Sequence, residues 1–131
     1  MVSLAQELQH VKTYLNIEKY RFKDLQVQYE IPNHLLNLEV PNFLLQPIVE
    51  NAIKHGISKK ATAHLICLSV RQRGQYLYFS IYNEGPVLSN EIMGTGLTNI
   101  KKQLQVLYGE SGKLSIKSFK NGVVVEISIP V

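Results

Sequence analysis

The sequence predicts an α+β fold, in which helices cover one face of a mostly antiparallel mixed sheet as a two-layer sandwich. Three observations lead to this prediction. The expected elements run α-β-α-β-β-α-β-β over 131 residues, the last four strands form two hairpin-like pairs, and each helix is apolar along one side. Hairpins place antiparallel strands side by side, and a helix with one apolar stripe buries it against a neighbouring layer.

Composition narrows the class of protein. Hydrophobic residues make up 45% and charged residues 18% of the chain, which is typical of one globular domain. The net charge of +4 is spread along the sequence without a basic stripe and interleaved aromatics, so we expect no nucleic-acid partner. A single cysteine, Cys67, excludes a disulfide framework and fits a reducing cytoplasm.

The first 31 residues predict a helix followed by a strand. Ser3 and Gln6 have the spacing of a capping box, and apolar residues then recur at helical intervals as far as Phe22. In this helix Glu7 falls among the polar positions, and we expect its apolar stripe to be partly exposed in this chain. Residues 25–31 alternate between apolar and polar side chains, as in a half-buried strand.

The next segment predicts a loop over residues 33–41 and a second helix over residues 42–56. Gly56 ends the helical pattern. Pro47 lies inside it, and proline removes a helical hydrogen bond unless it occupies the first turn. Either the helix therefore begins near Leu44, or it is kinked at Pro47.

The second half of the chain predicts two hairpins with a helix between them. Residues 63–72 and 75–83 are strand-like runs joined at Arg73–Gly74, and residues 84–96 read as a loop. A third helix follows, with apolar residues from Leu97 to Leu107 and an end at Gly109. Residues 113–119 and 123–130 are strands around Asn121–Gly122, a strong hairpin signal.

Polar residues interrupt the core pattern of the second helix. Leu44, Ile48, Asn51 and His55 share one stripe, which is apolar in its first half and polar in its second. Glu50 and Lys54 form a neighbouring pair four residues apart, which is either a solvated surface pair or part of a polar pocket. Amide and carboxylate oxygens can hold Mg²⁺ and a lysine can neutralise phosphate, so the stripe is a candidate metal–polyphosphate site.

Two further interruptions lie at element ends. Asn83 continues the inward face of the strand residues Leu77, Phe79 and Ile81, so its amide needs a partner, which is either backbone or the edge of a bound base. Gly85 would let a flat ligand approach the backbone. The run Gly94-Thr95-Gly96-Leu97 precedes a helix, where free N–H groups favour phosphate, although such a run is also common in ordinary loops.

These residues carry a resemblance to a known family. "LLQPIVENAIKHGI" (44–57) resembles the N-box of histidine kinases, and "MGTGLTNIKKQLQVLYG" (93–109) is similar to their second glycine box and the helix after it. "ELQHVKTYLNIEKYRF" (7–22) resembles the segment that precedes the ATPase domain in the LytS-like branch. The resemblance implies the Bergerat (GHKL) ATP-binding fold, which DNA gyrase and MutL share.

By position, the resemblance implies a role for each candidate residue. Asn51 would coordinate Mg²⁺ on the phosphates of ATP, and Glu50 would orient or activate the phosphate-accepting group. The remaining residues would bind ATP. Lys54 and His55 would lie near the phosphates, and Asn83 and Gly85 would contact the adenine. A short lid over the phosphates would end at Gly94, Thr95 and Gly96, and the next helix would begin at Leu97.

The sequence departs from the family pattern in the first glycine box. The family has Asp-x-Gly-x-Gly, whereas this chain has Asn83-Glu84-Gly85-Pro86-Val87. Asparagine accepts a hydrogen bond without the charge that strengthens it. The lid before Gly94 is also short. These two departures leave open a non-catalytic relative that serves as a signalling or dimerisation scaffold, and a nucleotide-free binding module. An anti-sigma-factor serine kinase is a third alternative, although the segment 7–22 argues against it.

For the longer protein, the resemblance implies a two-component sensor kinase anchored in the bacterial inner membrane, with this domain in the cytoplasm. Residues 1–23 would end the dimerisation and phosphoacceptor region, and residues 24–131 would form the ATP-binding domain. The phosphoacceptor histidine would lie outside this chain, because no histidine present has the matching context. The expected partners are that phosphoacceptor domain, a second copy in a homodimer, and a response regulator.

Overall fold

The first helix forms where the capping pattern places it. In the computed structural model, which describes residues 1–55, 64–85 and 95–131, α1 spans Leu4–Arg21 and the Oγ atom of Ser3 accepts the N–H of Gln6 at 3.1 Å. The expected partial exposure of its apolar stripe is wrong, because the sheet and the segment before α2 cover it. The buried stripe residues are Leu4, Leu8, Val11 and Leu15.

The sheet has five strands in the order β2-β4-β5-β7-β6. Only β2 and β4 run parallel, and the other neighbours are antiparallel, which confirms the predicted mixed, mostly antiparallel sheet. Each strand forms within two residues of its predicted bounds because alternation of apolar and polar side chains marks it. The strands are β2 (Leu25–Glu30), β4 (His64–Arg73), β5 (Tyr76–Glu84), β6 (Lys113–Phe119) and β7 (Gly122–Pro130).

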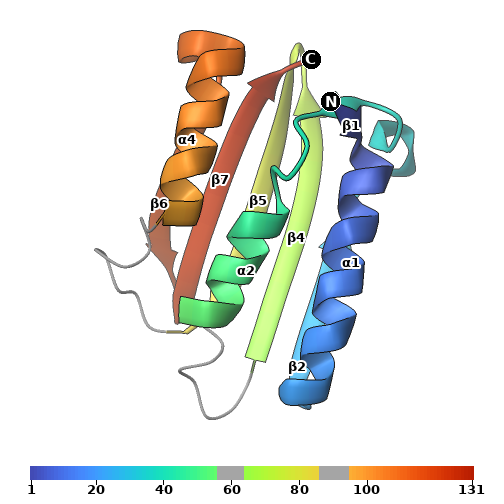
Figure 1. The fold of residues 1–131 in the computed structure, drawn as a ribbon, viewed down its shortest axis with the longest axis vertical. Helices are drawn as coiled ribbons and strands as arrows, with labels where there is room; N and C mark the ends of the chain where they lie inside the picture. Colours follow the sequence, from blue (N-terminus) through green and yellow to red (C-terminus); the bar gives the residue numbers. More distant parts are fainter. Residues whose placement is uncertain (56–63, 86–94) are drawn as a thin grey trace.

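The helices all lie on one face of this sheet, with α2 (Gln46–His55) between α1 and α4 (Thr95–Tyr108), as Figure 1 shows. Both neighbours contact α2 directly. A short 3-10 turn, η3, follows α4 at Gly109–Ser111, and Gly109 has a φ of 60°, as expected of a glycine that ends a helix. This arrangement is the two-layer α+β sandwich that the sequence predicts.

The segment before α2 has more structure than the predicted loop. A 3-10 turn, η1, covers Asn33–Leu35, and β3 (Glu39–Val40) pairs antiparallel with β1 (Val2–Ser3). Two-residue strands carry too few positions for an alternation pattern to mark them. Their pairing ties the start of α1 to the chain that leads into α2.

The second helix begins at Gln46, with Pro47 in its first turn. The N–H of Val49 donates to the carbonyl of Leu45 at 3.0 Å, so Leu45 occupies the N-cap position. Of the two alternatives at Pro47, the late start is therefore confirmed. A proline in the first turn costs little, because its missing N–H has no intrahelical partner there.

Both hairpin turns are displaced by one residue from their sequence signals, the first toward the C-terminus and the second toward the N-terminus. Gly74 and Gln75 connect β4 to β5, and Gly74 has a φ of 57°. Between β6 and β7 the connecting residues are Lys120 and Asn121, so the predicted turn at Asn121–Gly122 is wrong by one position. Lys120 takes the left-handed conformation, with a φ of 54°, while Gly122 belongs to β7 and pairs with Phe119 and Glu84.

One hydrophobic core lies between the two layers and draws on every helix and on all five strands of the large sheet. It includes Phe79 and Ile81 from β5, Ile48 from α2 and Leu97 and Leu104 from α4. No helix in the described part of the chain is long and apolar enough to cross a membrane.

Candidate functional site

The candidate residues come together at one end of the helical layer. The C-terminal end of α2, the C-terminal end of β5 and the start of α4 all lie toward the same end of the molecule (Figure 1). Both β5 and α4 contact α2. The three polar interruptions of the sequence pattern therefore converge on one region, between the sheet and its helices.

Asn83 lies at the sheet side of this region. It is only 6% exposed and shares the inward face of β5 with Phe79 and Ile81, which confirms the orientation predicted from strand alternation. Its Nδ2 atom donates to the carbonyl of Glu84 at 3.2 Å. The amide is therefore held by adjacent backbone at the edge of the core.

The backbone after Asn83 is held by the turn between β6 and β7. The N–H of Gly85 donates to the carbonyl of Asn121 at 3.1 Å, and Gly85 has a φ of 138°, which favours glycine. Gly122 lies so close that an added Cβ would overlap the carbonyl oxygen of Asn83. Close packing between two strand ends thus fixes the rim beside Asn83.

The second helix supplies the opposite side. Leu44 and Ile48 are buried in the core, whereas Asn51, next on the same stripe, is partly exposed. Glu50 and Lys54 are both exposed, and the Oε1 atom of Glu50 accepts a hydrogen bond from Nε2 of Gln46 at 3.2 Å. At Asn51 the stripe is therefore less buried than at Leu44 and Ile48, in the direction that the sequence indicates.

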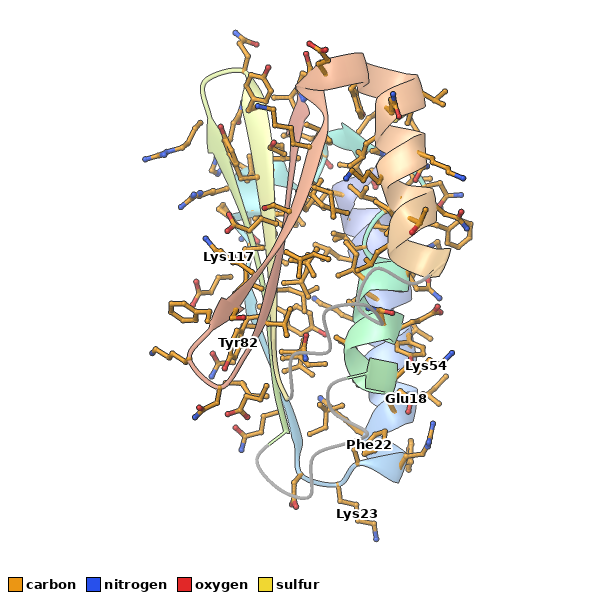
Figure 2. All side chains as sticks on the ribbon, turned by 90° about the vertical axis from the view of Figure 1, so that its left-hand side faces the viewer. Glu18, Phe22, Lys23, Lys54, Tyr82 and Lys117 are labelled. Carbon is orange, nitrogen blue, oxygen red and sulfur yellow. The ribbon has the colours of Figure 1, made fainter. Side chains whose placement is uncertain are left out.

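Glu50 is close to a polar cluster on α1. Burial, followed by the charges of Glu18 and Glu50 and a hydrogen bond to Glu18, raises the pKa of Tyr14 to about 12, with an opposing contribution from Arg21. The carboxylate of Glu18 lies 3.5 Å from Nη1 of Arg21. Figure 2 shows Glu18 and Lys54 near each other where α1 and α2 lie side by side. Glu50 therefore lies close enough to α1 for its charge to act on Tyr14.

Several candidate residues lie partly or wholly outside the described structure. Gly94 belongs to residues 86–94, which are not described, and nothing is described of the side chains of His55 and Thr95 or of the surroundings of Gly96. Leu97 is described and fully buried. Its side chain contributes to the core, and only its backbone can contribute to an α4 N-terminal site.

Sequence reasoning missed one residue that holds this region together. Glu7, which the helical pattern places among the polar positions, is 0% exposed. Its carboxylate accepts the backbone N–H groups of Phe43 at 3.1 Å, Leu45 at 2.8 Å and Gln46 at 3.4 Å. The pattern misses this role because the partners are backbone groups far along the chain, which helical periodicity cannot reveal.

The arrangement fits Mg²⁺ only as a companion of phosphate. Within the described residues, no group of three or more His, Cys, Asp or Glu side chains could hold a metal ion. Mg²⁺ commonly takes one or two protein oxygens and completes its shell with water and substrate phosphates. A partly exposed amide at Asn51, with no acidic cage, suits that second mode of binding.

Two hollows elsewhere on the described surface are separate from this site. One, of about 620 Å³, lies on the sheet face opposite the helices and includes Tyr82, Phe119 and Val124. The other, of about 640 Å³, lies beside the last turns of α4 and includes Gln105 and Gly112. None of the candidate residues lines either hollow.

Comparison by sequence identifies relatives, although no family model matches the chain. The sensor protein LytS of Streptococcus agalactiae is 34% identical over 144 aligned positions, which cover 98% of this chain and 25% of the relative. LytS of Streptococcus mutans is 30% identical, with 98% and 25% covered. The sensor histidine kinase BtsS of Escherichia coli is 39% identical over 118 positions, with 88% and 21% covered. The chain thus spans about a quarter of the length of these relatives.

Comparison by structure identifies the fold. The catalytic domain of the histidine kinase ThkA, in a nucleotide-free form, superposes with a TM-score of 0.75 at 20% identity, covering 98% of this chain and 93% of that one. The kinase domain of a blue-light activated histidine kinase from Erythrobacter litoralis gives 0.75 at 18% identity, covering 98% and 61%. ThkA in complex with the response regulator TrrA gives 0.72 at 19% identity, covering 98% and 40%. The fold is that of histidine kinase catalytic domains.

Proposed function

We propose that the chain belongs to the LytS-like sensor histidine kinases and is their ATP-binding catalytic domain. It would transfer the γ-phosphoryl group of ATP to a histidine outside this chain. One observation carries the proposal: the buried amide of Asn83 ends the inward face of β5 beside the helix that carries Asn51. The end of β5 could bind the base of a nucleotide, and α2 could bind its polyphosphate.

On the base side, Asn83 would accept a hydrogen bond from the adenine amino group through its amide oxygen. Its Nδ2 atom already donates to the carbonyl of Glu84, which leaves the oxygen as the acceptor of the amide. Gly85, held by the carbonyl of Asn121, would let the flat base approach the backbone. Guanine presents a carbonyl where adenine has its amino group, so this pair of residues would favour ATP over GTP.

On the phosphate side, Asn51 would contribute an oxygen ligand to Mg²⁺, while Lys54 and His55 would neutralise phosphate charge. The N-terminal end of α4 would add free N–H groups, with Gly94, Thr95, Gly96 and Leu97 contributing through the backbone. When bound, Mg²⁺ would offset the charge of the polyphosphate. The protein's own contribution is mainly positioning.

Glu50 would orient or activate the phosphate-accepting imidazole. Its carboxylate is exposed and steadied by Gln46, so it could meet a histidine brought from another domain. Nothing on this chain would then need to accept phosphate. The isolated chain should bind nucleotide without becoming phosphorylated.

In the longer protein, the proposed partners are its own phosphoacceptor domain, a second copy in a homodimer, and a response regulator. The ThkA complex with TrrA supports a regulator partner for this fold. Residues 1–23 would end the dimerisation and phosphoacceptor region, with residues 24–131 as the ATP-binding domain. The longer protein would be anchored in the bacterial inner membrane with this domain in the cytoplasm, and the relatives named as sensor proteins support a sensory role.

A second candidate function rests on Asn83 itself. The family pattern has aspartate at this position, and a neutral amide gives weaker recognition than a carboxylate. A domain with too little affinity for nucleotide would act as a signalling or dimerisation scaffold. The two candidates differ in one measurable property, which is nucleotide affinity.

Isothermal titration of the purified chain with ATP, with and without Mg²⁺, tests the proposal, with GTP as the control nucleotide. We expect saturable binding of ATP that Mg²⁺ strengthens, and weaker binding of GTP. Absence of binding up to millimolar ATP would favour the scaffold. Equal binding of ATP and GTP would remove Asn83 from base recognition.

A further inference from the structure

We propose that Glu7 is a positioning residue for the nucleotide site, acting from α1 through the N-terminus of α2. This inference rests on the proposed function, because the site that it affects is the candidate ATP site. Glu7 lies in the first turn of α1 and is fully buried, yet no charged side chain of the described structure pairs with it at salt-bridge distance. Its partners are backbone groups at the entrance to α2.

The contacts are those of a helix cap supplied by another helix. One oxygen of Glu7 accepts the N–H of Phe43, and the other accepts those of Leu45 and Gln46. Leu45 holds the N-cap position but has no polar side chain, so it cannot satisfy the free N–H groups of the first turn. A carboxylate at this end also interacts favourably with the helix dipole.

The backbone that leads into α2 has an unfavourable conformation and is stabilised by contacts with α1. Phe43 has a φ of 58°, a conformation that non-glycine residues rarely adopt, and its ring stacks on His10 with centroids 6.2 Å apart. The N–H groups of Leu4 and Ala5 donate to the carbonyls of Leu38 and Leu36 at 2.8 and 2.9 Å. The first turns of α1 thus form several hydrogen bonds to the segment that precedes α2, and those of Glu7 lie nearest the start of α2.

A rigid helix carries this position to the site. Asn51 lies six residues after Leu45, about 9 Å along the axis at the usual helical rise. Between these two residues, Ile48 and Val49 are buried in the core and fix the position of the helix. If the cap fails, the first turn frays or the helix shifts, and the amide of Asn51 moves relative to Asn83.

The consequence is a link between α1 and nucleotide affinity that needs no contact between Glu7 and the ligand. In the longer protein, movement of α1 would change the position of Asn51 through the same three hydrogen bonds. Nucleotide affinity would therefore depend on the position of α1.

The test compares Mg·ATP affinity in the wild-type chain, in Glu7→Gln and in Ile129→Val. The amide of glutamine places a donor group against N–H donors, so we expect Kd to rise on the order of tenfold. Ile129 is fully buried in β7, and β7 places it at the other end of its pairing with β5 from Asn83. It serves as a control that loses stability without touching α2, and its Kd should equal that of the wild type.

Two additional readouts keep the outcomes distinct. In ¹H–¹⁵N spectra without nucleotide, Glu7→Gln should shift the backbone peaks of Asn51 and its neighbours, and Ile129→Val should not. Glu7→Asp, which keeps the charge, should recover part of the affinity. If the wild type binds no ATP, the proposed function is overturned, and the Asn51 peaks alone decide whether Glu7 positions α2. Equal Kd and unmoved Asn51 peaks in Glu7→Gln would overturn the positioning role.

Discussion

Gly122 lies directly against the carbonyl oxygen of Asn83, with no space for a side chain between the two strands. Its place in the sequence, beside Asn121, resembles a turn glycine, but its φ is not in the left-handed region. The glycine is required by close approach between β7 and the end of β5. The position of the candidate adenine-reading residue therefore depends on a neighbour that never touches a ligand.

Replacement of Gly122 should show whether this position requires glycine for close packing or for turn geometry. Gly122→Ala should lower the free energy of unfolding by about 1–3 kcal/mol, because the methyl group must displace backbone or the ring of Tyr82. It should also weaken ATP binding by moving Asn83. Urea denaturation and isothermal titration measure the two effects.

Gly74→Ala provides the control for that experiment. Gly74 has a φ of 57° and open space around it, so alanine there should cost about 1 kcal/mol of conformational strain. It lies at the opposite end of β5 from Asn83. If it weakens ATP binding as much as Gly122→Ala does, close packing against Asn83 is not the cause.

Asn83→Asp should raise affinity and lower stability together. A carboxylate can accept the adenine amino group with charge assistance, which should lower Kd about five- to tenfold. Without nucleotide, the same carboxylate is largely buried and faces the carbonyl of Glu84, so unfolding should become easier by about 1–3 kcal/mol. Thermal unfolding with and without ATP measures both, and Asn37→Asp on the exposed surface is the matched control. Unchanged or weaker ATP binding would argue that this asparagine is suited to another role.

Asn51→Asp should weaken Mg·ATP binding while the fold persists. The change adds a negative charge near the proposed polyphosphate at a partly exposed position, so we expect Kd to rise about tenfold and Tm to change little. Asn16→Asp, at an exposed position of α1, is the control. Equal affinity of a folded Asn51→Asp protein would count against the metal-binding role.

Alkaline pH should remove a contribution of Tyr14 to stability. The folded pKa of about 12 lies above the ordinary value of 10.0, so folding favours the neutral phenol. The contribution is complete below pH 10 and is lost as pH rises toward 12. Tyr14→Phe has no phenol to ionise, so its free energy of unfolding should rise relative to that of the wild type between pH 9 and pH 11. Urea midpoints measure this, and a difference that stays constant with pH would refute it.

Much of the fold is accessible from local pattern. The alternation of Leu77, Phe79 and Ile81 predicts both β5 and the inward direction of Asn83, and the structure confirms both. Pro47 narrows the start of α2 to two alternatives. Such features depend on residues a few positions apart, which a sequence displays directly.

The remaining features depend on distant partners. Glu7 looks like a surface residue until its bonds to residues 36–39 positions away are known. The pairing of β1 with β3 spans a similar separation through strands of two residues. Gly122 has the right composition for a turn, and only the approach of Asn83 explains it. Gly94 lies outside the described residues, so its part in the site stays a prediction.

The cap that Glu7 supplies also bears on the order of folding. A ten-residue helix is marginal in isolation, and α2 has an apolar residue where a cap should be. It should therefore form only after the first turns of α1 have docked. Docking of α1 against the segment before α2 would then be an early step in folding. A polypeptide that starts at residue 24 would contain every residue proposed to touch ATP and still lack the group that starts its central helix. The ATP-binding segment would then begin at residue 24, whereas the segment that folds cooperatively would also include α1.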